Sequence, residues 1–438
     1  MSSLIIEQAY RNYALYVLNE RALLYIQDGL RASIRRAIWI ARNAQKQKTN
    51  SLSGAMAKLH PHGDASAVIQ NATSMFKNNI PYFDGNDAGF GTLLTPSRYS
   101  AARYTSVKLS NFAKDAILVD VDLIPMISNY DETCEEPEYL LPLVPLHLLN
   151  PITGMAIGYK CDIVPYKLAD LIDAQINVLD DNEINDLIPF FEPLQQRGEF
   201  VKRTPNGNNI WQFNGDCFKK GAKWVVTELP YGFDHTQFTN NLQKLFNEGT
   251  ITNIDDNSSD HINCSVSFAR NIEITGKDDV MKLLKLTNTQ TECLYFIDSS
   301  TKSVKQFTTK ETITTFTMHR LSYYKKRLDK QVEKLTDQTV YIKEVIKTID
   351  VIHERGGYIL QSKHEFEQLL LNNGVCVYVQ DILSLPIHKF NIQEKDKYIT
   401  SLQKIESELI HITETSLSDK KLRQLYKQEL KNIKKVYG

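Results

Sequence analysis

Two histidines and a lysine share one short turn, and these side chains are the first that could do chemistry. The stretch KLHPHGDAS at 58–66 places Lys58, His60 and His62 on a tight Pro/Gly turn leading into an expected helix. Backbone N–H groups and the helix dipole at such a start favour an anion such as a phosphate. A histidine pair alone is more often structural or a weak metal site than catalytic. The turn therefore predicts anion binding and leaves the histidines' chemistry open.

Two further stretches follow within fifty residues. FDGNDAGFGT at 83–92 is a glycine-rich loop, and YSAARYTSVKLS at 99–110 places Arg103 beside Tyr104 after small residues. A tyrosine hydroxyl has an ordinary pKa of about 10, so it needs help to act as a nucleophile at neutral pH. The chain has 21 tyrosines, so Tyr104 is not singled out by its residue type.

Several other chemistries are excluded by missing motifs. The chain has no GxxxxGK[ST], no HExxH and no GxSxG pattern, so a P-loop ATP site, a zincin site and a nucleophile elbow are not expected. Asp120 and Asp122 form the one DxD pair near the basic part of the chain, and their alternation favours an acidic edge strand over a metal site. No other carboxylate pair supports a two-metal site. We therefore expect no metal on this chain.

Composition fits a soluble multidomain protein with a local charge asymmetry. The 438 residues suggest about three structural units, at roughly 150 residues each. The total of 51 basic and 52 acidic residues excludes a uniformly basic coat, but residues 1–115 carry a net charge of +7 and residues 116–150 one of −7. A local basic groove for nucleic acid remains compatible with this pattern. Six cysteines without CxxC spacing indicate a reducing, cytoplasmic compartment.

No membrane segment is expected. The N-terminus carries Glu7 and Arg11 within its apolar stretch and lacks a signal-peptide layout. Residues 139–159 contain no formal charge and are long enough to span a bilayer. Prolines and a glycine interrupt this stretch, and each proline removes a helical hydrogen bond that lipid cannot replace. We predict buried loops and short strands there.

The chemical residues must be positioned by a helical first module. Ile34, Ala37, Ile38 and Ala41 repeat at helical spacing and predict one apolar face. The basic residues near them fall on another face, which for an arbitrary helix is more often simply solvated. A second helix is predicted from Asp64, an N-cap residue. We expect its inward face to be formed by Val68, Ala72, Met75 and Phe76. Two such helices resemble a helix-turn-helix arrangement.

The rest of the chain changes pattern twice. From about 145 to 310 it reads as mixed α/β, with WVVTELP (224–230) and CSVSFAR (264–270) as strands. After 310, apolar residues recur every seven positions, which predicts a long coiled-coil helix and a returning partner helix. Gly356-Gly357 is expected to end the first helix. The two apolar series are Leu321, Leu328, Leu335, Ile342, Ile349, and Ile399, Leu402, Ile405, Leu409, Ile412.

The order KxHPHGD, DGxxxGFGT, AARYT resembles the breakage–reunion subunit of type IIA DNA topoisomerases, the family of gyrase A and ParC. ERALLYIQDGLRASIRRAIWIA (20–41), SNYDETCEEPEYLLPLVPLHLLNPITGMAIGY (128–159) and WVVTELPY (224–231) extend the resemblance on both sides. The C-terminal heptads fit the family's arm. Within the family, the chain resembles most closely the medium subunit of the three-subunit topoisomerases of T-even-type phages.

The resemblance implies a fold and its boundaries. We expect an α+β multidomain protein with a winged-helix DNA-cleavage domain of helix-turn-helix type at 1–144. An α/β tower domain is expected at 145–310, and a long antiparallel coiled-coil arm at 311–438. The tip of the arm, at about 353–398, would carry a C-gate knob around Ile382, Leu383, Leu385 and Ile387.

The resemblance also implies roles for single residues. Tyr104 would form a transient 5′-phosphotyrosyl bond with DNA, and Arg103 and Arg21 would stabilise the phosphate. His62 would orient or deprotonate the tyrosine, with His60 and Lys58 as supporting contacts. DNA contacts are expected from Arg31, Arg35, Arg36, Arg42, Ser66 and Met155.

Two departures from the family pattern stand out. Relatives insert an isoleucine between base pairs to bend the duplex, and TGMAIGY places Met155 at that position. Methionine is apolar and adaptable, so wedging remains compatible. HGDAS resembles the eukaryotic HGExS more than the bacterial HGDS. Because the sequence ends at Gly438, no β-pinwheel is expected, which disfavours DNA wrapping.

The implied activity is that of an ATP-hydrolysing type II DNA topoisomerase that acts as a C2 dimer on double-stranded DNA. Mg²⁺ and ATP would be bound by separate Toprim and ATPase subunits. The location would be the cytoplasm with the nucleoid, or the cytoplasm of an infected bacterial host if the protein is phage-encoded. One alternative is a non-catalytic coiled-coil dimeric DNA-binding protein. Another is a metal-dependent nuclease or phosphodiesterase that uses the histidine pair, although it lacks metal carboxylates.

Overall fold

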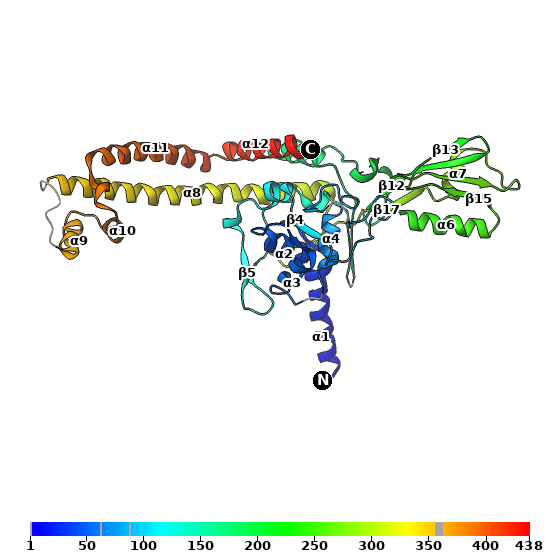
Figure 1. The fold of residues 1–438 in the computed structure, drawn as a ribbon, viewed down its shortest axis with the longest axis horizontal. Coiled ribbons are helices and arrows are strands. Elements are labelled where there is room, and N and C mark those ends of the chain that lie inside the picture. The colour runs from blue at the N-terminus through cyan, green and yellow to red at the C-terminus, as the bar shows by residue number, and fades with distance from the viewer. Residues whose placement is uncertain (1, 62–63, 87–88, 157, 355–361) are drawn as a thin grey trace. The chain divides into compact units, whose positions relative to one another are not determined.

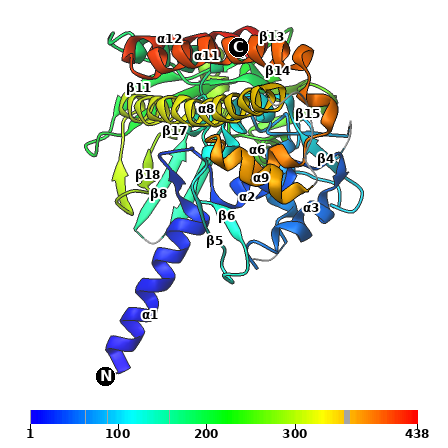
Figure 2. The same ribbon diagram turned by 90° about the vertical axis from the view of Figure 1, so that its left-hand side faces the viewer.

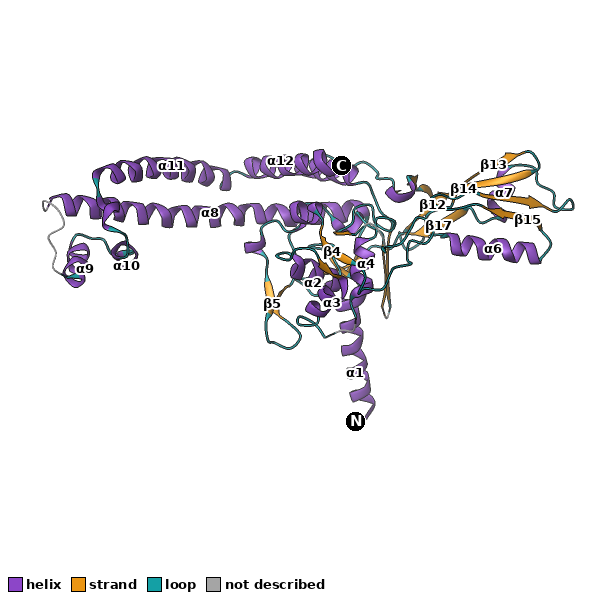
Figure 3. Ribbon diagram, viewed as in Figure 1, coloured by secondary structure: helices purple, strands orange, loops and turns teal. Residues whose placement is uncertain are grey.

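The computed structural model describes residues 2–61, 64–86, 89–156, 158–354 and 362–438. The chain forms two compact units: unit 1 comprises Met1–Arg320 and Lys427–Gly438, and unit 2 comprises Leu321–Tyr426. Helices and small sheets are both present, which confirms the predicted α+β class (Figure 3). The two boundaries between the three domains predicted from sequence stay predictions.

The first part of unit 1 combines several helices with a small antiparallel sheet of order β2-β4-β3. Its first helix, α1, extends away from the body of the unit (Figure 2), and its residues Tyr10 and Tyr13 are exposed. The elements are α1 (Ser2–Val17), η1 (Leu18–Ala22), β1 (Leu24–Tyr25), α2 (Ala32–Ala41), β2 (Gln47–Lys48), α3 (Thr49–Met56), α4 (Ser66–Thr73), β3 (Phe83–Gly85), β4 (Ser106–Leu109), η2 (Ala113–Ile117), η3 (Val121–Leu123), β5 (Met126–Ser128) and β6 (Glu135–Pro137).

The two predicted helices near the site are present, with one correction. On α2, Ala37, Ile38 and Ala41 are buried, as the apolar spacing predicts. The second helix, α4, begins at Ser66 and ends at Thr73. Met75 therefore lies beyond its end and is 66% exposed, so its predicted inward position is wrong.

The acidic pair also differs from its prediction. Residues 120–122 do not form an edge strand: Asp120 has a left-handed φ of 55°, and η3 begins at the next residue. The Asp120 carboxylate accepts a hydrogen bond from Arg320 Nη2 at 2.6 Å, and the Arg320 side chain is 1% exposed. This acidic residue therefore anchors a buried arginine of unit 1.

The second part of unit 1 is built mainly on an antiparallel sheet of order β13-β14-β16-β15. The predicted strands at 224–230 and 264–270 are confirmed as β14 and β16, which pair directly with Val225 opposite Ser265. Phe238 and Leu242 of α6 and Val280 of α7 pack against this sheet in one apolar core. Figure 1 shows both helices beside the sheet.

The remaining elements of this part complete unit 1. They are η4 (Leu146–Leu148), β7 (Ile152–Ala156), β8 (Tyr159–Ile163), α5 (Leu168–Leu179), β9 (Phe190–Phe191), η5 (Glu192–Leu194), β10 (Gln196–Arg197), β11 (Glu199–Arg203), β12 (Asn209–Asn214), β13 (Asp216–Lys220), β14 (Lys223–Glu228), α6 (His235–Asn247), β15 (Ile251–Asp256), β16 (Cys264–Phe268), α7 (Lys277–Leu283), β17 (Thr287–Thr291), β18 (Tyr295–Asp298) and β19 (Ser303–Gln306).

The uncharged stretch from 139 to 159 has the structure predicted for it. Residues 139–150 are all buried, and the stretch continues through η4 into the hairpin β7–β8. Across the part of the chain that the structure describes, no helix combines the length and apolar character needed to cross a bilayer. The stretch is therefore part of the core of unit 1.

Unit 2 is formed by two long helices that run antiparallel. Helix α8 (Thr309–Glu354) enters it from unit 1, and α11 (Ile392–Ser416) returns beside it (Figure 1). Their contacts step in opposite directions along the two helices. Lys395 pairs with Asp350, Lys343 Nζ lies 2.8 Å from Glu406 Oε1, and the Ser416 hydroxyl donates to Asp329. Of the predicted heptad positions on α8, Leu321, Leu328, Ile342 and Ile349 are buried.

The outer end of unit 2 holds short helices over a second apolar core. Ile382 is fully buried there, and Leu383 and Leu385 pack against the same core, so only Ile387 of the predicted knob is well exposed, at 69%. Gly356 and Gly357 lie outside the described residues. The elements that follow α8 are α9 (Lys363–Asn372), α10 (Val379–Leu383), η6 (Ile387–Phe390), α11 and α12 (Asp419–Tyr437), whose last residues belong to unit 1.

Candidate active site

Tyr104 is presented on an exposed turn immediately before β4. Its side chain is 63% exposed, and the Arg103 guanidinium carbon lies 4.8 Å from the centre of the tyrosine ring. The backbone N–H of Tyr104 donates to the Ala101 carbonyl at 2.8 Å, which closes the turn. A phenol and a guanidinium are thus held together where a large substrate can reach both.

The base of this turn is tied down from behind by two helices. Thr49, the first residue of α3, donates its N–H to the Thr105 carbonyl at 3.1 Å, and the two hydroxyl oxygens lie 2.7 Å apart. Gln70 of α4 donates its side-chain amide to the Ser100 carbonyl at 2.6 Å. Thr49, Gln70 and Thr105 are buried, so the turn is rigid at its base while Tyr104 stays accessible.

The loop that follows α3 carries Lys58 and His60. The Lys58 side chain is exposed, and its carbonyl accepts a hydrogen bond of 3.1 Å from the side-chain amide of Asn129. Asn129 follows β5 and also accepts, through its side-chain oxygen, the N–H groups of Thr133 and Cys134. The segment 128–134 therefore braces the loop. His62 lies outside the described residues, and its predicted role stays a prediction.

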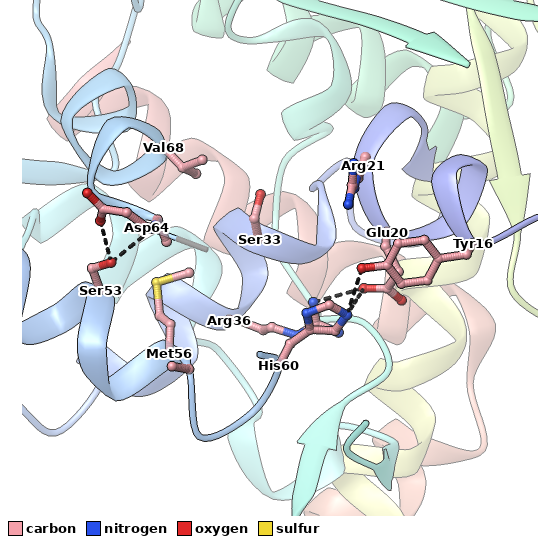
Figure 4. Close-up of a pocket in the computed structure, with 12 residues that line it drawn as sticks. Tyr16, Glu20, Arg21, Ser33, Arg36, Ser53, Met56, His60, Asp64 and Val68 are labelled. Atoms are coloured by element: carbon pink, nitrogen blue, oxygen red, sulfur yellow. Dashed lines mark hydrogen bonds and ion pairs between the residues drawn. The ribbon is translucent and has the colours of Figure 1, made fainter. Parts of the chain in front are cut away.

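A cavity of about 190 Å³ opens beside this loop (Figure 4). It brings together residues from the end of α1, from η1, and from α2, α3 and α4. Two predicted catalytic residues, Arg21 and His60, line it, whereas Tyr104 and Arg103 do not. The lining residues are Tyr16, Glu20, Arg21, Ser33, Arg36, Ser53, Met56, Ala57, His60, Asp64, Ala65 and Val68.

His60 is held in a cage of aromatic and acidic groups. The residue is 9% exposed, and its Nε2 lies 3.3 Å from the Tyr16 hydroxyl and 3.9 Å from a Glu20 carboxylate oxygen. The Tyr16 ring stacks on the imidazole with centroids 5.9 Å apart, and the Tyr130 ring lies 5.3 Å away. The Arg21 side chain, on the π-helical turn η1, lies over Tyr16 with its guanidinium carbon 5.5 Å from the ring centre.

The sequence analysis did not identify Tyr16 or Glu20 as site residues. The signal available was their spacing, since Tyr16 lies four residues before Glu20 and five before Arg21 at the start of a matched motif. On a helix, residues four apart lie on one face. A helix through residue 22 would thus have placed Tyr16 and Glu20 together.

Arg35 and Arg36, which were predicted to contact DNA, are both buried and paired with carboxylates, and Arg36 also lines the cavity. Arg35 is 5% exposed and forms two hydrogen bonds to the Asp28 carboxylate, at 2.6 and 3.0 Å. Arg36 is 8% exposed, pairs with Glu136 at 2.5 and 2.8 Å, and lies 2.8 Å from Glu20. Each arginine is thus bound to a carboxylate inside the module, and removing either partner would leave a buried charge unpaired. The predicted DNA contacts of both arginines stay predictions.

Two other predicted DNA contacts, Arg42 and Ser66, differ in their surroundings. Arg42 folds back over the Trp39 ring, with its guanidinium carbon 3.6 Å from the ring centre. Ser66 is 4% exposed, so its side chain offers little surface to DNA, and its N–H donates to Asp64 Oδ1 at 2.8 Å. Hydrogen bonds from Ser66 and then Ser53 lower the pKa of Asp64. Asp64 thus stays ionised at the start of α4.

Met155 is presented at the end of the hairpin β7–β8 and is 74% exposed. The hairpin is fixed at its base, because Arg31 donates to the Thr153 carbonyl. A Cβ atom on Gly154 would overlap the Ala22 carbonyl oxygen, so the hairpin packs directly on the backbone beside Arg21. Met155 is therefore an exposed apolar side chain on a firmly seated hairpin.

A second, larger cavity of about 910 Å³ separates this module from the sheet part of unit 1. Arg31, Lys77 and Asn71 line one side, and His235 and His261 line the other. Burial lowers the pKa of Lys77. In the residues that the structure describes, no group of three or more His, Cys, Asp or Glu side chains could hold a metal ion.

Residues 21–431 match the family of the A subunit of DNA gyrase and topoisomerase IV. The chain is 23% identical to the DNA gyrase A subunit of Mycolicibacterium smegmatis, with 99% of this chain and 56% of that protein aligned. It is 26% identical to the DNA topoisomerase 4 A subunit of Escherichia coli, over 99% of this chain and 61% of that protein. The chain thus spans little more than half the length of these relatives. With the match covering most of its residues, the chain belongs to the A-subunit family of DNA gyrase and topoisomerase IV.

Proposed function

We propose that this chain is the DNA-cleaving and rejoining subunit of an ATP-dependent type II topoisomerase, with Tyr104 as the nucleophile. The observation that carries the proposal is the exposed Tyr104 with Arg103 over its ring, on a turn anchored at Thr49 and Gln70. Family membership over residues 21–431 supports the same activity.

The proposed cleavage step is a transesterification. The Tyr104 oxygen attacks a DNA phosphorus, a 5′-phosphotyrosyl ester forms, and the 3′ oxygen leaves as a hydroxyl after taking a proton. Reversal of the step rejoins the strand without any change in the number of phosphodiester bonds. Arg103 offsets the charge that develops on the phosphate oxygens, because a guanidinium can donate two parallel hydrogen bonds to them.

The test is to trap the covalent adduct with Tyr104→Phe and a matched control. The chain and its partner subunits are incubated with DNA, denatured and digested, and the modified peptide is identified by mass spectrometry. Tyr104→Phe should abolish the adduct while DNA binding survives. Tyr99→Phe is the control, because Tyr99 lies in the same segment, donates to Asn71, and has a pKa raised by burial to about 12. An adduct that persists in Tyr104→Phe contradicts the proposal.

The finer architecture is part of the same proposal. The helices α2 to α4 with the sheet β2-β4-β3 would be the winged-helix cleavage domain, the sheet part of unit 1 the tower, and unit 2 the coiled-coil arm. Met155 would wedge between base pairs. Met155→Ala should then reduce DNA bending, measured by energy transfer across a short duplex, and leave phosphate binding intact.

Partners and cofactors follow from the same assignment. Mg²⁺ and ATP would be supplied by separate Toprim and ATPase subunits, so relaxation should require these subunits, ATP and Mg²⁺ together. The chain would act as a C2 dimer, which supplies one nucleophile for each strand. Ile387 is a better probe of the dimer contact than Leu383 or Leu385, because it is exposed and they pack against the core of unit 2. Ile387→Asp should shift sedimentation toward monomer. The closer likeness to phage subunits stays a prediction.

The alternative of a non-catalytic DNA-binding dimer is separated by the same trapping experiment. Such a protein would bind DNA equally well with Tyr104 or Phe at that position and would give no adduct in either case. The exposed placement of Tyr104 beside Arg103 supports the catalytic proposal, because both side chains are accessible to a DNA phosphate.

A further inference from the structure

Tyr16 contacts two of the residues proposed to assist cleavage, although it belongs to no motif that singled it out. We propose that Tyr16 and Glu20 are positioning residues, which hold the His60 imidazole in one orientation and tautomer for DNA cleavage. The inference rests on the proposed topoisomerase function and adds two residues to its site. Neither needs to touch DNA, since both act through His60.

The geometry leaves the His60 ring little freedom. Its Nε2 faces the Tyr16 hydroxyl at 3.3 Å and the Glu20 carboxylate at 3.9 Å. Tyr16 stacks on the imidazole with an interplanar angle of 22°, and the Tyr130 ring lies 5.3 Å from the imidazole at 58°. Because His60 is only 9% exposed, rotation of the ring would require these neighbours to move.

The chemistry of the contacts favours one tautomer. A carboxylate only accepts hydrogen bonds, and its negative charge favours a proton on the nearer imidazole nitrogen. With Glu20 on the Nε2 side, the proton resides on Nε2 and donates to the Tyr16 oxygen, so Nδ1 carries the acceptor lone pair. The hydroxyl of Tyr16 and the charge of Glu20 thus set which nitrogen can serve as a base.

Glu20 is itself held in place by the buried arginine next to it. Arg36 Nη1 lies 2.8 Å from Glu20 Oε2, and Arg36 Nε and Nη2 bind both oxygens of Glu136. The chain of contacts runs from Glu136 on β6 through Arg36 and Glu20 to His60. Figure 4 shows its last three members beside the cavity. In this series of contacts the buried Arg36 holds the Glu20 carboxylate in place, a role that does not require contact with DNA.

The charged and titratable groups around the imidazole come from several elements. Glu20 and Arg21 lie on η1, Arg36 on α2, and Tyr16 on α1, while Tyr130 follows β5. Arg21 lies over the Tyr16 ring, so removing the Tyr16 hydroxyl leaves that cation–π contact in place. Tyr16→Phe therefore isolates the His60 contact.

The first test measures cleavage and binding separately with Tyr16→Phe and Glu20→Gln. Single-turnover cleavage is measured at saturating DNA with the full chain and its partner subunits, and affinity is measured by titration. Each variant should slow cleavage by about tenfold or more, the loss expected for one hydrogen bond or charge contact, with affinity unchanged. Tyr13→Phe is the matched control, since Tyr13 lies on the same helix and is 54% exposed. Loss of affinity with normal cleavage would overturn the inference.

The second test asks whether Tyr16 acts through His60. In a double-mutant cycle, Tyr16→Phe should slow cleavage in the native background and have no further effect in His60→Ala. A role in stability alone would give the same loss in both backgrounds, and that result contradicts positioning. If Tyr104→Phe abolishes the adduct while Tyr16→Phe and Glu20→Gln are silent, this inference fails and the proposed function stands.

Discussion

The turn that carries Tyr104 and the loop that carries His60 position their side chains in opposite ways. The turn is anchored through its backbone and the neighbouring Thr105, and its two chemical side chains are exposed. The loop keeps His60 buried and surrounds it with Tyr16, Glu20 and Tyr130. Under the proposed function Tyr104 would have to reach a bulky duplex, which exposure allows, and His60 would have to hold one orientation, which its buried surroundings favour.

The contrast also sorts the arginines. Arg103 is exposed beside Tyr104, while Arg35 and Arg36 are buried and paired with carboxylates. Paired, buried arginines stabilise the fold, and exposed ones remain available to a phosphate. Burial and pairing therefore distinguish residues that support the fold from residues proposed to act on DNA better than residue type does. Four experiments can test this distinction.

The largest effect is expected at the buried pair. Asp28→Asn should lower the free energy of unfolding by about 3–5 kcal/mol, because it leaves the buried Arg35 without its counter-charge. Asp28 also accepts the N–H groups of Leu30 and Leu140, so the segment 28–30 should loosen as well. Denaturant titration measures the loss. A variant of unchanged stability would show that the pair is not a scaffold contact.

Arg103→Ala should change cleavage and leave stability unchanged, in contrast with Asp28→Asn. We expect cleavage to slow by about 10²–10³ with unchanged unfolding free energy, because Arg103 acts on charge that develops in the transition state. Single-turnover cleavage and thermal melting of the same preparation provide the comparison. If only salt-dependent affinity falls, Arg103 is an ordinary phosphate contact.

The third prediction concerns how the buried His147 makes the stability of the chain depend on pH. Burial lowers its pKa from 6.5 to about 4, its Nε2 hydrogen-bonds to the Tyr25 carbonyl at 3.0 Å, and Phe296 and Phe316 flank the ring. Between pH 6.5 and 4 the unfolded chain binds a proton that the folded chain does not. Stability should therefore fall as pH falls through this window, by about 3 kcal/mol.

The pH effect of His147 has its own control. Denaturant titrations at several pH values, with His147→Phe beside the native chain, isolate the contribution of this histidine from that of the carboxylates. The variant should lose that part of the pH dependence. An identical dependence in both proteins would contradict the assignment.

The smallest effect is expected at the anchor of the turn. Thr49→Val removes the hydroxyl contact of 2.7 Å with Thr105 and keeps the side-chain shape. Stability should fall by about 1 kcal/mol, the usual net contribution of one hydrogen bond. If the anchor fixes the turn, cleavage should slow severalfold as well, whereas normal cleavage would show that the backbone contacts suffice. Ser110→Ala, which removes a different side-chain contact of β4's end, is the control.

Local patterns predicted several elements well. The strand-like stretches WVVTELP and CSVSFAR predicted β14 and β16, and the sevenfold apolar spacing predicted the long α8 and its returning partner α11. These features depend on residues close in sequence or on a long repeat. The position of Tyr104 in the site came from a family resemblance and from no local pattern.

Local sequence patterns could not predict which charged side chains are buried or with which distant residues they pair. One of the two carboxylate partners of Arg36 is Glu136, one hundred residues away, and no helix pattern around Arg36 points to it. The sequence did contain a signal, since the acidic segment 116–150 follows the basic first module and their charges are complementary. For His60, the cage depends on α1 and on the segment after β5 folding against the same loop.

The contact of Gly154 with Ala22 limits how this protein could evolve. Any side chain at position 154 would collide with the Ala22 carbonyl oxygen, because its Cβ would overlap that atom. Met155 on the same hairpin is exposed and can be substituted without such a collision, whereas a larger residue at position 154 would require the backbone to shift. A change in how the hairpin presents Met155 must therefore come from positions other than 154, because Gly154 allows the hairpin to pack on the backbone next to Arg21.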